Sequence, residues 1–140
     1  MQPIKEERTC YDQLAIVEKY NTCLYYLYNI LQNFPSHHRV LRDVVLSHLF
    51  SVTPHFNLAA KTGLIRKLYD ADAALADVRN DLEVMSKILW NKNDKGSVRT
   101  LLAANQREHC EAMLYAVGGM LNAWIRHKNE GRNPKGQTGS

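Results

Sequence analysis

The chain has 140 residues, of which 45% are hydrophobic and 23% charged, and a formal net charge of +4. This composition is ordinary for a globular protein, and the length suits one domain that buries roughly two thirds of its unfolded surface. No stretch approaches the ~18 consecutive apolar residues of a transmembrane helix, and no apolar run of a secretory signal follows the charged N-terminus. Three cysteines at unrelated spacings predict reduced thiols and a cytoplasmic protein.

The first predicted helix covers residues 12–34. Its apolar side chains repeat every seven residues in two series: Val17, Leu24 and Leu31, and Tyr20, Leu27 and Phe34. This wide stripe is typical of a helix in a globular bundle. We expect Asp12 to be the N-cap, because its carboxylate can accept hydrogen bonds from the first backbone N–H groups. Pro35 is expected to end the helix, since the residue before a proline is disfavoured in the α region.

The second predicted helix begins after Ser36, its expected N-cap, and runs to about Lys61. Its apolar positions are spaced by three and four residues: Leu41, Val45, Leu49, Val52, Phe56 and Ala59. Pro54 removes one helical hydrogen bond at a cost of about 3 kcal/mol, so we expect a kink there or, as an alternative, a break at Thr53. Gly63 is expected to end the helix in a left-handed conformation.

The third predicted helix has the most regular repeat. Leucines recur at seven-residue steps with other apolar residues between them: Leu68, Leu75, Leu82 and Leu89, with Ala71, Val78 and Met85. Residues 91–96 predict a turn, and Ser97 is the expected N-cap of the next helix. Four long helices with short connections predict an all-α, up-down-up-down four-helix bundle over residues 1–130.

The fourth predicted helix, between Val98 and Asn129, is apolar on two faces. One face has large side chains: Cys110, Met113, Val117, Met120 and Trp124. The other has small ones: Ala112, Ala116, Gly119 and Ala123. A bundle helix needs one apolar face for its own core, so the small residues predict an interface between copies of the chain. Residues 131–140 are predicted to form a flexible, basic C-terminal tail.

Charge is distributed unevenly along the chain. Residues 35–69 carry five Lys or Arg against one Asp, and residues 126–140 carry four against one Glu. Between them, residues 70–83 carry five acids against one Arg. A basic surface releases counterions when it meets phosphate, which favours a nucleic-acid partner. Solvated helix ends are the alternative interpretation of the same charges.

The acidic residues of the third helix do not predict a metal site. Asp70 and Asp72 diverge by ~200° around a helix and cannot converge on one ion. Asp77 and Asp81 share a face, but no His or Cys joins them at ligand spacing. The sequence also lacks a Gly-rich phosphate loop, so we expect neither a metal nor a cofactor.

Two histidines of the second helix allow two interpretations. His48 and His55 lie one heptad apart near the apolar face, where a boundary histidine with a polar partner is the ordinary case. Alternatively, Arg42 and His48 resemble the Arg-to-His motif of HEPN ribonucleases, in which the histidine assists proton transfer on RNA. No Ser or Cys has a sequence context that marks it as an activated nucleophile.

Several blocks resemble the accessory variability determinant (Avd) of diversity-generating retroelements. They are CYDQ at 10–13, IVEKY at 16–20, YLY at 26–28, KLYDADAALA at 67–76, VGGMLNAWI at 117–125 and KGQ at 135–137. The resemblance covers nearly the whole chain. The broader family of four-helix bundle proteins encoded in ribosomal-RNA intervening sequences shares this architecture and provides an alternative without a retroelement role.

The resemblance to Avd implies a fold, partners and a function. Avd-like proteins form a barrel-shaped homopentamer of four-helix bundles with a basic outer surface. The pentamer binds the retroelement reverse transcriptase and the template-repeat RNA, and it supports error-prone copying of adenines during mutagenic retrohoming. Such a protein is not an enzyme. A HEPN-like ribonuclease that uses Arg42 and His48 is the third hypothesis.

Basic residues near the matching blocks are the candidates for contact with RNA or the polymerase: Lys61, Arg66, Lys67, Arg79, Arg126, Lys128, Arg132 and Lys135. Lysine meets phosphate as a point charge and arginine as a bidentate fork. For Arg79 the alternative is an ion pair with Glu83, four residues further on. Glu83 stands where the resemblance implies a positive side chain. Gly118 and Gly119 lie inside a predicted helix, where each glycine costs about 1 kcal/mol in helix propensity.

Overall fold

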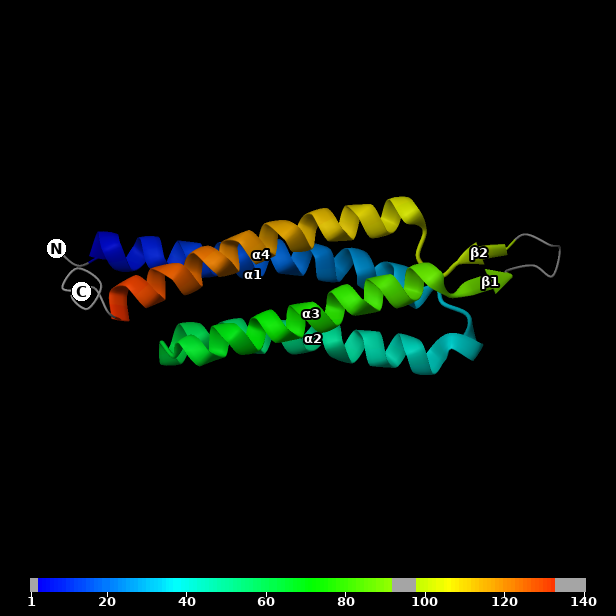
Figure 1. Ribbon diagram of the computed structural model, residues 1–140, viewed down its shortest axis with the longest axis horizontal. Helices are drawn as coiled ribbons and strands as arrows, with labels where there is room; N and C mark the ends of the chain where they lie inside the picture. The colour runs from blue at the N-terminus through cyan, green and yellow to red at the C-terminus, as the bar shows by residue number, and fades with distance from the viewer. Residues whose placement is uncertain (1–2, 92–97, 133–140) are drawn as a thin grey trace.

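The computed structural model describes residues 3–91 and 98–132. The elements follow in the order α1 (Pro3–Gln32), the 3-10 helix η1 (Ser36–His38), α2 (Arg39–Thr62), α3 (Ile65–Lys87), β1 (Leu89–Asn91), β2 (Val98–Thr100) and α4 (Ala104–Arg132). Successive helices run in opposite directions (Figure 1). Because α4 packs against both α3 and α1, the four helices close into a bundle. The predicted four-helix bundle is therefore confirmed.

The hydrophobic core lies between the four helices along their whole packed length. Leu68, Leu75 and Leu82, the heptad leucines of α3, are fully buried. Tyr20 of α1 is buried as well, and its hydroxyl donates a hydrogen bond to the carbonyl of Leu49 in α2. That bond satisfies the polar end of an otherwise apolar ring. The heptad patterns thus identified the core-facing side of each helix.

The first two helices begin elsewhere than predicted. α1 already begins at Pro3, so Asp12 lies inside it and is not its N-cap. Proline suits the first helical position because the N–H that it lacks would have no partner there. Ser36 does not cap α2, because it lies in η1, and His38 occupies the N-cap position without a side-chain cap. The η1 turn forms because the His38 N–H donates to the carbonyl of Pro35.

The interior proline of α2 does not break the helix. α2 continues through Pro54 to Thr62, so the alternative of a break at Thr53 is wrong. Gly63 follows with φ 71°, and its N–H donates to the carbonyl of Ala59 at 2.9 Å. Since glycine has no Cβ to clash in this left-handed conformation, the predicted stop at Gly63 is confirmed.

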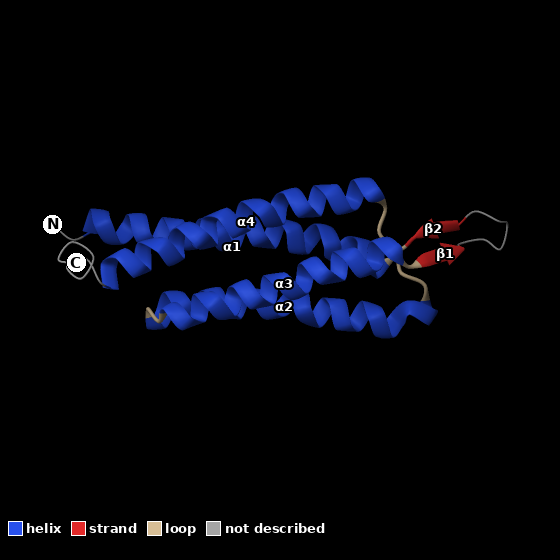
Figure 2. Cartoon of the chain, in the orientation of Figure 1, coloured by secondary structure: helices blue, strands red, loops and turns tan. Residues whose placement is uncertain are grey.

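A β-hairpin replaces the end of one predicted helix and the start of the next. β1 and β2 pair antiparallel and extend from the bundle, as Figure 2 shows in red. Leu89, predicted as the last heptad leucine of the third helix, lies in β1 with 67% of its surface exposed. α3 ends earlier, at Lys87, because Ile88 adopts an extended conformation. Most of the predicted turn, residues 92–96, falls outside the described residues.

The fourth helix begins at Ala104, six residues later than predicted. Ser97 lies outside the described residues and too far along the chain to cap α4. Instead, the side-chain oxygen of Gln106 accepts a hydrogen bond from the backbone N–H of Ala103 at 3.0 Å, which is one half of a capping box. α4 continues to Arg132, two residues past residue 130, where the predicted bundle ends. The rest of the predicted tail, residues 133–140, lies outside the described residues.

Candidate nucleic-acid and partner interface

The connection between α2 and α3 carries three of the predicted contact residues. Gly63 reverses the chain, so that Lys61 at the end of α2 lies close along the chain to Arg66 and Lys67 at the start of α3. Lys61 and Arg66 are exposed. Lys67 is partly buried and lies 3.9 Å from a carboxylate oxygen of Asp70, a separation at which an exposed pair contributes little stability.

The last turns of α4 lie against this connection. The Nζ of Lys128 is 3.4 Å from the position that a Cβ on Gly63 would occupy. Arg126, two residues earlier in the same helix, is exposed. Figure 1 shows the end of α4 and the α2–α3 connection at the same end of the bundle. We call this surface the basic end, and it comprises Lys61, Arg66, Lys67, Arg126 and Lys128.

Of the remaining predicted contact residues, Arg79 lies away from the basic end. Arg79 lies fourteen residues beyond Ile65, the first residue of α3, which is about 21 Å along the helix at 1.5 Å per residue. Arg132 is the last residue of α4, and Lys135 lies outside the described residues. The structure therefore places five of the eight predicted residues at one end of the bundle, where Arg126 lies about 200° around α4 from Lys128.

The side chain of Arg79, which lies on α3, is held by the neighbouring helix α4. Its guanidinium donates a hydrogen bond to the carbonyl of Leu114 in α4 at 3.5 Å. A Cβ on Gly118 would lie only 2.9 Å from the same nitrogen, so this glycine leaves room for the arginine to cross. The ion pair between Arg79 and Glu83 is not the contact seen, because Glu83 pairs with Arg107 and with Lys87. Gly118 is thus explained within one copy of the chain.

Gly119 has no such explanation among the described residues. A Cβ on Gly119 would meet nothing within 4 Å. Ala112 and Ala123 are also exposed, and Ala116 is partly buried. The predicted small-residue face of α4, which comprises Ala112, Ala116, Gly119 and Ala123, is therefore largely open in the single copy.

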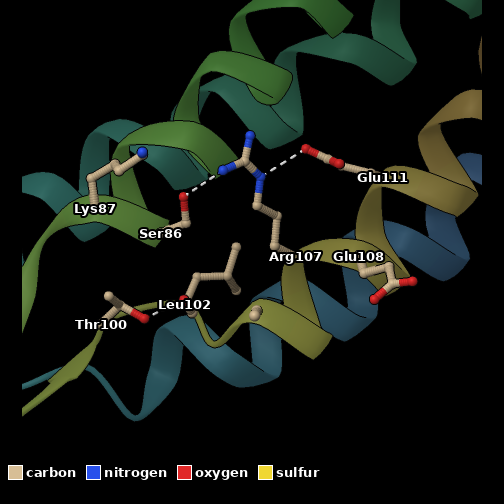
Figure 3. A pocket seen from close by; sticks show the side chains of 8 residues that line it. Ser86, Lys87, Thr100, Leu102, Arg107, Glu108 and Glu111 are labelled. Carbon is tan, nitrogen blue, oxygen red and sulfur yellow. Dashed lines mark hydrogen bonds and ion pairs between the residues drawn. The ribbon is translucent and has the colours of Figure 1, made fainter.

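A pocket of about 440 Å³ lies where α3, β2 and α4 meet (Figure 3). Arg107 lines it and donates hydrogen bonds to Glu111 at 2.8 Å, to Ser86 at 2.8 Å and to Glu83. The hydrogen bonds to Glu111 and Glu83 raise the pKa of the Arg107 guanidinium. Because these carboxylates neutralise the arginine, Arg107 is not a free cation for a phosphate.

Sequence reasoning missed the role of Arg107. The spacing of four residues between Arg107 and Glu111 could have indicated a helical ion pair. The contact with Glu83 could not be seen, because 24 residues separate the two positions. The contact with Arg107 explains why an acid occupies position 83, because the ion pair links α3 to α4.

His48 is engaged in a contact between α2 and α3. Its Nδ1 lies 2.7 Å from a carboxylate oxygen of Asp81, which is only 6% exposed. Burial raises the pKa of the Asp81 carboxyl, and the hydrogen bond from His48 opposes that rise. His48 thus fits the interpretation of a boundary histidine with a polar partner, whereas the buried Nδ1 of His55 has no partner among the described residues. Arg42 contacts its neighbour Asp43 at 3.2 Å.

The described parts of the chain do not assemble the other kinds of site considered from the sequence. No group of three or more His, Cys, Asp or Glu in residues 3–91 and 98–132 is placed to hold a metal ion. None of the helices described there has the length and apolar character needed to cross a membrane.

The fold and this surface define a class of protein: a four-helix bundle that gathers cations from three helices at one end. Residues 14–128 match the family described as bAvd-like. The chain therefore belongs to the bacterial Avd family, as the sequence blocks predicted. Membership implies an accessory protein of a diversity-generating retroelement, and proteins of this family are generally non-catalytic. A comparison with curated proteins found no match.

Proposed function

We propose that this protein binds the reverse transcriptase and the template-repeat RNA of its retroelement and supports mutagenic cDNA synthesis and retrohoming. Its role is to position RNA and polymerase, without chemistry of its own. Family membership gives the retroelement context. The observation that carries RNA binding is the basic end, where Lys128 of α4 reaches the α2–α3 connection.

The basic end suits an RNA backbone. Lys61, Arg66 and Arg126 expose their charges to solvent, and each contact with a phosphate releases condensed counterions. Such contacts position nucleic acid without reading its sequence. In this proposal Arg132 and Lys135 add nonspecific contacts with phosphate. Arg79 belongs to a separate contact with the polymerase, beside the exposed ring of Tyr115.

We further propose that the protein assembles as a barrel-like homopentamer through the small-residue face of α4. A helix interior that contains Gly119 loses about 1 kcal/mol relative to alanine, and no described residue uses the space beside it. A close approach by a second copy would use it. Assembly also multiplies the basic end, because each copy adds one.

The test is the native mass of the purified protein with and without its template-repeat RNA at two salt concentrations. We expect a pentamer that binds RNA at low salt and releases it at high salt. The double variant Lys61→Gln, Arg66→Gln should weaken binding. It should also reduce the slope of log affinity against log salt concentration by about 0.7, the value for single strands, for each phosphate that is no longer neutralised. Arg39→Gln, an exposed cation at the other end of α2, is the matched control and should bind as the wild type does.

Two results would contradict the proposal. If the protein does not bind RNA at low salt, the proposed RNA-binding function is wrong, although the fold is unaffected. An equal reduction in affinity for each charge removed, in the Arg39 control and in the double variant, would show that net charge matters and that the basic end has no special role. Co-purification with the cognate reverse transcriptase tests the polymerase contact separately.

A further inference from the structure

An exposed tyrosine lies among the cations of the basic end. Tyr69 of α3 is 50% exposed. It follows Arg66 by three residues, so the two side chains are neighbours on the surface of the helix. Arg66 is exposed as well, and exposed Lys61 precedes the turn at Gly63. The basic end therefore presents an aromatic ring together with solvated cations.

The two helices that meet at this turn repeat the combination of a cation with an apolar side chain. Leu58 of α2 is 40% exposed and precedes Lys61 by three residues, as Arg66 precedes Tyr69 on α3. Leu64, between the two helices, is 48% exposed. Each exposed cation of the turn thus has an exposed apolar side chain one helical turn away, on the same side of its helix.

Other strongly exposed aromatic side chains of the described chain have different surroundings. Tyr115 of α4 lines a pocket together with Glu111. Phe50 of α2 packs edge to face against Tyr28 of α1, with ring centroids 6.1 Å apart. Tyr69 is the exposed aromatic residue that lies within the basic end.

Acidic side chains bound this site towards the middle of α3. Asp72 and Asp77 follow Tyr69 by three and eight residues and are exposed. Asp70 lies 3.9 Å from the ammonium group of Lys67. Phosphates are therefore attracted to the turn side of Tyr69 and repelled from its other side. A polynucleotide backbone should cross the end of the bundle at this point and should not follow α3.

One further carboxylate lies near the end of α4. Glu130 is exposed and follows Arg126 by four residues, so it shares the side of Arg126. Lys128 lies about 200° around the helix from both of them, and its Nζ reaches the turn at Gly63. The cations best placed to hold phosphate beside Tyr69 are therefore Lys61, Arg66 and Lys128.

An aromatic ring beside cations suits single-stranded nucleic acid. The cations hold the phosphates while a base stacks on the ring, and the stacking tolerates any sequence because every base has a flat π face. Unpaired RNA bases are free to splay out onto such a ring. A duplex keeps its bases in its own stack, so it can use the cations of the basic end but gains nothing from Tyr69.

We propose that Tyr69 stacks on a base of single-stranded RNA whose phosphates contact Lys61, Arg66 and Lys128. This inference rests on the RNA binding in the proposed function and specifies the form of RNA, an unpaired segment, that the basic end selects. It also gives the site a contribution to affinity that does not depend on salt in the way that phosphate contacts do.

Two RNA probes test the proposal: a single strand of about 16 nucleotides without self-complementarity, the upper range for one small single-strand site, and the duplex of the same sequence. Tyr69→Ala should bind the single strand at least about 5-fold more weakly than the wild type, the lower end of the loss for one stacked base. Its affinity for the duplex should not change. The slope of log affinity against log salt concentration should also stay the same, because no cation is removed.

Two further variants serve as controls. Tyr69→Phe keeps the ring and should bind both probes as the wild type does. Tyr25→Ala removes a 61% exposed tyrosine from α1, in the half of that helix that runs towards the hairpin (Figure 1). It should likewise leave both affinities unchanged. Circular dichroism of each variant, expected to match the wild type, verifies that a loss of binding does not come from unfolding.

The outcomes separate this inference from the proposed function. A wild type that binds neither probe would contradict RNA binding itself. If the wild type binds RNA and Tyr69→Ala binds the single strand equally well, the basic end binds RNA through charge alone and the stacking is wrong. Equal losses for the single strand and the duplex would also overturn the inference, as would a Tyr69→Phe protein as weak as Tyr69→Ala.

Discussion

At the scale of single residues, Asp81 is the most costly polar group in the described core. It is 6% exposed, and burial raises the pKa of its carboxyl above the ordinary value of 3.8. A carboxyl with a raised pKa favours the folded state most when it is protonated. Its contribution to the free energy of unfolding is therefore fully present below pH 3.8 and is lost as the pH rises through the raised pKa. His48 reduces this loss by bonding to the ionised form.

The replacement Asp81→Asn should consequently become more favourable as the pH rises. Asparagine keeps a hydrogen-bonding group beside His48 but cannot ionise. We expect the free energy of unfolding of the variant, relative to the wild type, to increase between pH 4 and pH 7.5 in urea titrations. Asp43→Asn, which changes an exposed carboxylate, should show no such trend. If the difference in free energy of unfolding between Asp81→Asn and the wild type did not change with pH, burial of the ionised Asp81 carboxylate would not carry the cost assigned to it.

At the scale of elements, repeats over many residues were predictable and short or distant features were not. The leucines of α3 identified its buried side because the same pattern recurs over three heptads. β1 and β2 have three residues each, too few for an alternating pattern to stand out. The cations around Gly63 were predictable from their closeness in sequence. Lys128 joins them only through the closure of the bundle by α4.

The uninterrupted course of α2 leads to a prediction about its proline. Pro54 is exposed within the helix, where its missing N–H leaves the carbonyl of residue 50 without the usual partner. Pro54→Ala should raise the free energy of unfolding by about 1–3 kcal/mol, since an interior proline costs about 3 and restricts the unfolded chain by about 0.4–1. Urea titration of a variant set in the Gly119→Leu background, in which the small-residue face is filled and assembly should be lost, measures this without a contribution from assembly.

Pro35 provides the matched control for this prediction. It lies outside the α-helices with φ −62°, which its ring favours. Pro35→Ala should therefore lower the free energy of unfolding by about 0.4–1 kcal/mol, because the unfolded chain gains freedom. The two prolines should thus respond with opposite signs. If both replacements changed the free energy of unfolding in the same direction, the strain that Pro54 imposes on α2 would be relieved in another way.

At the scale of the whole molecule, the net charge of +4 conceals a separation of charges. The cations of the basic end come from three helices and lie at the end of the bundle away from the hairpin (Figure 1). Near the hairpin, Arg107 is neutralised by Glu83 and Glu111. A single copy therefore offers RNA a small number of exposed cations. In the proposed ring, binding strength depends on how many copies engage one RNA molecule.

This dependence predicts that loss of assembly weakens RNA binding although no basic residue changes. Several basic ends on one ring reach the same RNA at a high effective concentration, which can strengthen binding by about 10²–10⁴-fold over one end. Gly119→Leu fills the small-residue face and should leave the protein monomeric. It should therefore bind the template-repeat RNA at least about 10²-fold more weakly than the wild type, with a much smaller salt dependence, because fewer phosphates are neutralised. Titration of labelled RNA at several salt concentrations measures both quantities. The double variant Lys61→Gln, Arg66→Gln separates the two causes, since it should weaken binding while it keeps the native mass of the wild type. If the monomeric Gly119→Leu protein bound RNA as tightly and with the same salt dependence, a single basic end would suffice and assembly would serve the polymerase contact instead.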